Sequence, residues 1–467
     1  MERRAPPAGG FTKFLVQRGY RRARVVRNAD GEAAGVPSFV PVIPVETFRT
    51  YAPRGTRLLL LSSFLATVPL GYLIVVLPLY LARAGIEPAV IGGLYAASGA
   101  VTALLVAFSG VFADRWGRRR FLLAGTLLPI GSYLVFATTT DVPWLVFASF
   151  LGGVGLANGA AGALTISSFD ALLADNTTET TRTKVFASSQ ALWSLALAVG
   201  SLSAGAPEII HRLFPEISEL VAYRPPYLAM AVITLFAGLV LIPIRDDPAV
   251  HAKRVASGWW PKRSRQAILT YSIAIGFLGF ALGVAIQLLP LWYSLRFGVN
   301  EADLGPWYAA GQLASLGTLV AVPYLERRLG GPNTILFALS TSAVCLALIV
   351  VAPVFVVAAV LHLVRSFLTN LSWPFHQSLL MTTTVPEERA TAVGTGFAVW
   401  GTTNALGPLA AGLMIGAGVY AIPLLVGSLM YVCGGLVFGL GFRRLLAKRA
   451  AAPLGAPLAA GGGDGAS

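Results

Sequence analysis

The stretch GVFADRWGRRRFLL, from Gly110 to Leu123, decides the fold of this chain. In it an uncharged apolar run is followed by Asp114 and four arginines, and a second apolar run begins at Phe121. Such a short basic segment between apolar runs predicts a tight turn between two membrane helices, held on the cytoplasmic side by its arginines. Gly110 allows two helices to approach closely, and Gly117 permits a turn with positive φ.

The composition predicts a membrane protein. Of its 467 residues, 55% are hydrophobic and 12% are charged, and the mean hydropathy is +0.71. A soluble globular chain carries about 25% charged residues. The formal net charge of +14 would suggest nucleic acid in a soluble chain. Here the basic residues gather in short loops, so topology explains the charge and we expect no nucleic-acid partner.

Apolar runs fill most of the chain, and each is long enough to cross a hydrocarbon core of about 30 Å, which takes about 20 helical residues. We expect twelve transmembrane helices, which place both termini on the same side of the membrane. The runs are residues 58–81, 89–113, 121–140, 142–169, 185–206, 225–244, 267–292, 304–325, 331–351, 354–384, 390–415 and 419–442. The two cysteines, Cys345 and Cys433, lie in such runs and are interpreted as free thiols.

Loop charges predict which side holds the termini. Basic residues gather in every second loop and in the tail, whereas the opposite loops are short or mixed in charge. By the positive-inside rule both termini are cytoplasmic, in the plasma membrane. Besides the first stretch, the basic positions are Arg182, Lys184, the segment 245–265, Arg327, Arg328, Arg443, Arg444, Lys448 and Arg449.

The spacing of the first stretch is Gly, three residues, Asp-Arg, one residue, Gly and three arginines. It resembles the loop signature of the major facilitator superfamily, which joins the second and third transmembrane helices. A weaker copy, GTLVAVPYLERRLGG, places Glu326 where the first half has Asp114. Arg389 after helix 10 likewise matches Arg182 after helix 4. The resemblance covers roughly residues 57–445 and implies an all-α membrane protein of two pseudo-symmetric six-helix bundles.

The basic central stretch splits the chain into two halves, a division that the repeat supports, and five parts result. They are a cytoplasmic N-terminal tail at 1–56, an N-terminal bundle at 57–244, a cytoplasmic central loop at 245–265, a C-terminal bundle at 266–445 and a disordered tail at 446–467. Within the first part, FTKFLVQRGYRRARVV fits either a short basic helix on anionic headgroups or a mostly disordered tail.

The sequence carries no pattern of catalysis. It has no metal-spaced His/Cys cluster, no phosphate-binding glycine loop and no triad, and it lacks an ATP-binding domain. We therefore expect neither an enzyme nor a primary pump, with no cofactor and no metal. The expected partners of this monomer are the lipid bilayer, a small-molecule substrate and a proton or another coupling ion.

Arg365 is the exception among the apolar runs, since the other eleven carry no charged residue in their interiors. A charge at that depth costs at least about 2.5 kcal/mol, so it should face a cavity and serve a function. His362 lies one turn earlier on the same face. The functional interpretation is a contact with an anion or polar group of the substrate. The alternative is an arginine bonded to helix carbonyls or to an amide side chain within the bundle.

Further polar residues are candidates for the walls of the same cavity, and each has the alternative of an interhelical hydrogen bond worth about 0.6 kcal/mol. Aligning the two halves through Arg182 and Arg389 places Asn158 opposite Arg365. The other cavity candidates are Gln190, Trp193, Gln287, Gln312 and Asn404.

The resemblance also implies a cytoplasmic gate. In relatives, an acid at the inner end of helix 4, here Asp170, pairs with the loop arginine that corresponds to Arg118. The expected gating residues are Gly110, Asp114, Arg115, Gly117, Arg118, Arg119 and Asp170.

Together these features predict a secondary transporter that works by alternating access. Export coupled to an ion gradient is favoured, because no sugar-porter signature is visible. Helix 5 lacks the Gly-Pro pattern of the superfamily's drug–proton antiporters, and helix 4 lacks their usual arginine. Two alternatives stay open, an organic-anion uptake carrier and a transporter-like membrane sensor that does not transport.

Overall fold

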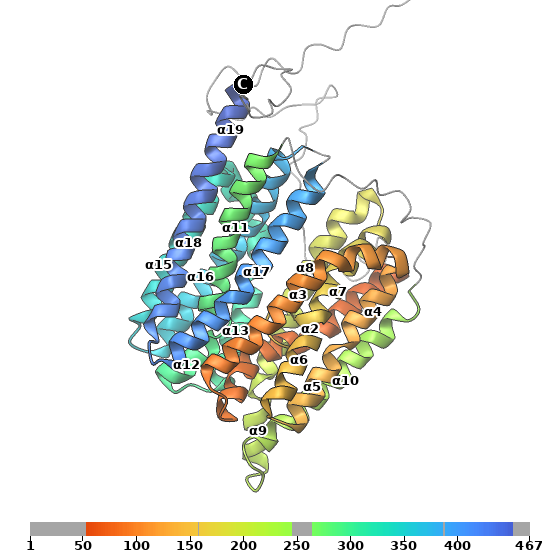
Figure 1. The fold of residues 1–467 in the computed structure, drawn as a ribbon, viewed down its shortest axis with the longest axis vertical. Helices are drawn as coiled ribbons and strands as arrows, with labels where there is room; N and C mark the ends of the chain where they lie inside the picture. The colour runs from red at the N-terminus through yellow and green to blue at the C-terminus, as the bar shows by residue number, and fades with distance from the viewer. Residues whose placement is uncertain (1–52, 157, 245–263, 386–387, 452–467) are drawn as a thin grey trace, which may run out of the picture. The chain divides into compact units, whose positions relative to one another are not determined.

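The computed structural model describes residues 53–156, 158–244, 264–385 and 388–451 (Figure 1). Nearly all of the predicted N-terminal tail, most of the central loop and most of the C-terminal tail lie outside these ranges. All regular secondary structure in the described ranges is helical. The domain boundaries predicted from the sequence stay a prediction.

The first half of the chain forms a group of helices that we call the N-terminal bundle. Its elements are α2 (Arg54–Arg83), α3 (Pro88–Trp116), α4 (Arg118–Leu127), α5 (Pro129–Thr138), α6 (Val142–Leu151), α7 (Gly159–Asp175), α8 (Glu179–Leu202), η1 (Ser203–Gly205), α9 (Ala206–Leu213), η2 (Val221–Tyr223) and α10 (Arg224–Leu241).

The second half forms the C-terminal bundle. Its elements are α11 (Arg265–Ile286), α12 (Leu289–Phe297), α13 (Glu301–Ser315), α14 (Thr318–Leu329), α15 (Gly331–Val350), α16 (Phe355–Thr383), α17 (Arg389–Gly416), α18 (Ala421–Leu436), the π-helix η5 (Val437–Gly441) and α19 (Phe442–Ala451).

Nine helices in the described ranges are long and apolar enough to cross a membrane. The three other predicted runs are also helical, but two of them are interrupted. Run 142–169 is divided into α6 and α7, run 304–325 contains most of α13 and part of α14, and run 390–415 lies within α17.

The interruption between α6 and α7 is a true unwinding of the backbone. Gly153, Gly155 and Asn158 adopt φ values of 72°, 67° and 63°, in the left-handed region that glycine and asparagine tolerate best. Helix α3 replaces part of the lost helical hydrogen bonding. Ser98 donates to the carbonyl of Val154 at 2.7 Å, and Thr102 donates to that of Gly159 at 2.7 Å. The sequence analysis treated this run as one continuous helix.

Glycines allow close packing within and between the bundles. Inside the N-terminal bundle, a Cβ at Gly200 of α8 would overlap the backbone of α2 at Val68. Between the bundles, a Cβ at Gly412 of α17 would overlap the carbonyl of Pro88 in α3, and one at Gly305 of α13 would overlap that of Ser201 in α8. Backbones this close maximise van der Waals contact, which drives helix association in lipid.

The two bundles contact each other at one end of their helices. Helix α2 ends there at Arg83, and α12 contacts α2, while α13 contacts η1 and α9. We call it the Arg83 end; it lies away from α19 (Figure 1). The structure is therefore of a state in which the two bundles are in contact at the Arg83 end.

Candidate functional site

Arg365 lies inside the C-terminal bundle and is 3% exposed. One of its terminal nitrogens donates to the hydroxyl of Tyr431 in α18 at 3.0 Å. Its Nε has no hydrogen-bond partner among the described residues, and no carboxylate in those ranges forms an ion pair with it. A buried guanidinium with one neutral partner retains an uncompensated positive charge.

Three aromatic residues extend this polar site. The ring of His362 lies 5.3 Å from that of Tyr308 in α13 and 6.3 Å from that of Tyr293 in α12, measured between centroids. Within the described chain, His362 Nδ1 and the hydroxyl of Tyr308 have no hydrogen-bond partner.

We call these five side chains the Arg365 cluster: Tyr293, Tyr308, His362, Arg365 and Tyr431. Its unpaired polar atoms are buried, and buried polar groups in native proteins are nearly always hydrogen-bonded. The cluster therefore holds buried polar atoms whose hydrogen-bond partners are not among the described residues. The sequence analysis found Arg365 and His362 but missed the tyrosines, which belong to three other helices.

Gln287 and Asn404 form a second polar contact at the interface. Gln287 donates to the side-chain oxygen of Asn404 at 2.9 Å, and Asn404 donates to the carbonyl of Gly279 at 3.2 Å. The amide oxygen of Gln287 accepts a long hydrogen bond, 3.4 Å, from the backbone of Leu156 in the unwound segment. These residues thus connect the C-terminal bundle to the break between α6 and α7.

The remaining cavity candidates are placed in three ways. Asn158 accepts a hydrogen bond from the backbone N–H of Gly153, a local contact that stabilises the break. Gln312 is half-buried in α13, while Gln190 is exposed and Trp193 is 40% exposed on α8. Substrate contact by any of them, and the placement of Asn158 opposite Arg365, stay predictions.

The loop signature forms the junction of α3 and α4. Gly117 adopts a φ of 97° between the two helices, and Gly110, Asp114 and Arg115 lie in the last turns of α3. The side chains of Asp114 and Arg115 lie outside the part that the structure describes.

Arg118 has a different carboxylate partner from the one that the resemblance implied. It is 6% exposed and pairs at 2.6 Å with Asp175, in the last turn of α7. Asp170 is exposed. It lies five positions before Asp175, and since a helix turns about 100° per residue, the two side chains lie on different faces of α7. Arg119 donates to the carbonyl of Ile242. A gating role for these residues stays a prediction.

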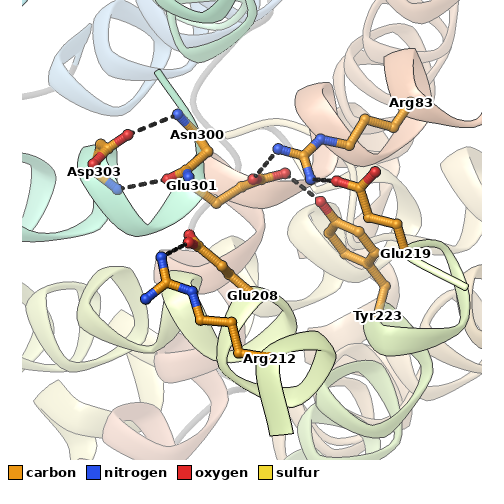
Figure 2. Close-up of polar contacts among 8 residues, drawn as sticks. All are labelled: Arg83, Glu208, Arg212, Glu219, Tyr223, Asn300, Glu301 and Asp303. Carbon is orange, nitrogen blue, oxygen red and sulfur yellow. Dashed lines mark hydrogen bonds and ion pairs between the residues drawn. The ribbon is translucent and has the colours of Figure 1, made fainter. Parts of the chain in front are cut away.

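The sequence analysis missed one set of interacting charged residues altogether. At the Arg83 end, Glu301 accepts hydrogen bonds from Arg83, at 2.8 Å, and from the hydroxyl of Tyr223 (Figure 2). Arg83 also pairs with Glu219 in the segment between α9 and η2. We call these four residues the Arg83 cluster. The only sequence signal was an arginine at the end of an apolar run, and nothing in the sequence indicated its partners.

Comparison with known proteins decides the family. The model of the Major Facilitator Superfamily matches residues 59–385. The chain belongs to the Major Facilitator Superfamily. This confirms the predicted family, the all-α membrane fold and the prediction that the protein is a transporter and not an enzyme.

Two curated relatives come from Bacillus subtilis (strain 168). Multidrug resistance protein 2 is 23% identical over 303 residues, which cover 62% of this chain and 70% of that protein. Multidrug efflux protein YfmO is 22% identical over 409 residues, which cover 85% of this chain and 96% of the relative.

Solved structures share the fold. The nucleoside transporter NupG superimposes with a TM-score of 0.61 at 13% identity, covering 84% of this chain and 99% of that one. A bacterial homolog of the human lysosomal transporter Spinster, in an inward-facing and occupied conformation, gives a TM-score of 0.64 at 16% identity, with coverages of 85% and 98%.

Proposed function

We propose that this superfamily member exports a small organic solute, driven by an ion gradient. The observation that carries the proposal is the similarity to curated multidrug resistance and efflux proteins, which in one case extends over 85% of the chain. The helix 4 and helix 5 patterns that differ from drug–proton antiporters leave the coupling ion and the solute open.

The Arg365 cluster favours a second candidate, the transport of an organic anion. A buried cation without a carboxylate partner among the described residues can bind a carboxylate or phosphate by paired N–H donors. This candidate concerns the charge of the solute and is compatible with either direction of transport.

Proteoliposomes provide the test. We expect purified protein to move a solute from a panel of lipophilic cations, neutral drugs and organic carboxylates when a pH gradient is imposed. Vesicles without protein are the control, and a second series without the gradient separates active from passive transport. Accumulation only down the solute's own gradient would refute ion coupling, and binding without transport would favour the sensor.

We also propose that the protein is a monomer in the plasma membrane. Both of its termini then lie in the cytoplasm. We expect a reporter fused after Arg449 to be cytoplasmic, and one inserted between Glu208 and Arg224 to be external. The basic loops on one side are the physical reason. Finding both reporters on one side would overturn the twelve-helix topology.

A further inference from the structure

The two carboxylates that share Arg83 differ in their surroundings. The side chain of Glu301 is 5% exposed, whereas that of Glu219 is 56% exposed and that of Arg83 is 31% exposed. A solvated ion pair contributes little, because water competes with it. A buried carboxylate that loses its partners is left uncompensated at a much larger cost. Glu301 therefore depends on Arg83 far more than Glu219 does.

The cluster is also divided unequally between the bundles. Arg83 ends α2, Tyr223 ends η2 and Glu219 precedes it, so all three belong to the N-terminal bundle. Only Glu301, the first residue of α13, comes from the C-terminal bundle. Separation of the bundles at this end breaks both hydrogen bonds of Glu301 and leaves the pair of Arg83 and Glu219 intact.

Contacts within each bundle hold both sides of this contact in place. Asn300 and Asp303 form a reciprocal capping box at the start of α13, with distances of 3.0 and 3.1 Å, which fixes the backbone of Glu301 (Figure 2). The ring of Tyr223 packs against that of Tyr80 in α2, with 5.1 Å between centroids.

We propose that the Arg83 cluster is a two-position switch that controls opening of the transporter at the Arg83 end. In the closed state Arg83 binds Glu301 and Glu219, and Tyr223 adds a second hydrogen bond to Glu301. In the open state Arg83 retains Glu219 alone. Glu301 is thus the residue that holds the end closed, and Glu219 is the residue that keeps the arginine paired when it opens.

This arrangement makes the two glutamates opposite in effect, although they bind the same arginine. A group shifts a two-state equilibrium only by the difference between its interactions in the two states. Glu301→Gln weakens contacts that exist only in the closed state, so it should favour opening. Glu219→Gln removes the sole partner of Arg83 in the open state but one of two in the closed state, so it should favour closing.

The experiment measures the distance between the bundles at this end. The full-length protein, with Cys345 and Cys433 replaced by alanine, carries spin labels at Glu216 and Arg296, both exposed. Double electron–electron resonance in lipid nanodiscs then gives the ratio of open to closed populations. Because no solute is needed, failure of this test is distinguishable from failure of the export proposal.

We expect Glu301→Gln to raise the open-to-closed ratio about tenfold, the effect of losing a hydrogen bond to a charged group. Tyr223→Phe should raise it less, and it provides a reading if Glu301→Gln does not fold. In the Tyr223→Phe background, where opening is measurable, Glu219→Gln should lower the ratio about twofold to fivefold.

A matched control lies close by. Glu208 pairs with Arg212 four residues later on α9, so this ion pair lies within one helix and does not join the bundles. Arg212→Gln removes this ion pair at a side chain that is 76% exposed, so it should leave the ratio unchanged. The switch is overturned if Glu301→Gln and Glu219→Gln shift the ratio in the same direction, or if Arg212→Gln shifts it as much as Glu301→Gln does.

Discussion

Arg365→Ala should abolish transport of an anionic solute while the protein still folds. The guanidinium is 3% exposed and has only the hydroxyl of Tyr431 as a partner among the described residues. A bound anion would therefore balance its positive charge. A hydrogen bond to a charged group contributes about 1.5–3 kcal/mol, so losing even one should weaken binding about tenfold to hundredfold. The measurement is uptake of organic carboxylates into proteoliposomes, with thermal stability of the purified variant read in parallel.

Two conservative variants separate recognition from folding. Arg365→Lys keeps the positive charge but loses the planar fork, so it should weaken anion binding and retain stability. Tyr431→Phe removes only the hydroxyl partner and should leave the arginine free to bind the anion. Normal transport by a folded Arg365→Ala protein would show that the arginine is structural.

Gly412→Leu should stop the transport cycle by preventing closure at the Arg83 end. A Cβ at this position overlaps the carbonyl of Pro88 in α3, which belongs to the other bundle. Overpacking of this kind costs about 1–3 kcal/mol, and here it is confined to the closed state. The open-to-closed ratio should therefore rise about tenfold to hundredfold, measured with the same pair of spin labels.

The control is one turn further along α17. A Cβ at Gly416 would meet its nearest neighbours in Ala89 at 3.8 Å or more, an ordinary contact. Gly416→Ala should therefore transport normally. Gly200→Leu gives a third, distinct result, since its clash with α2 lies inside one bundle and should reduce folding in every state. If Gly412→Leu closes normally, the bundles must approach each other differently.

The break between α6 and α7 shows how far local sequence carries the prediction. The segment LGGVGLANGAAG is apolar enough to belong to a membrane helix, so hydropathy alone treats it as part of a continuous span. Its glycines permit unwinding but do not require it. The break is stabilised by Ser98 and Thr102 of α3, and a hydroxyl on a neighbouring helix is invisible to a scan along one segment.

By itself the sequence determined the membrane class, the helical runs, the loop signature and the buried charge at Arg365, because hydropathy and charge act along the chain. Only the tertiary structure decided which side chains meet. It paired Arg118 with Asp175, brought Tyr308 and Tyr431 into the Arg365 cluster, and joined Arg83 to Glu301, which lies 218 positions away. Such pairs depend on how helices pack face to face, and no periodicity within a single helix records the partner that it will contact.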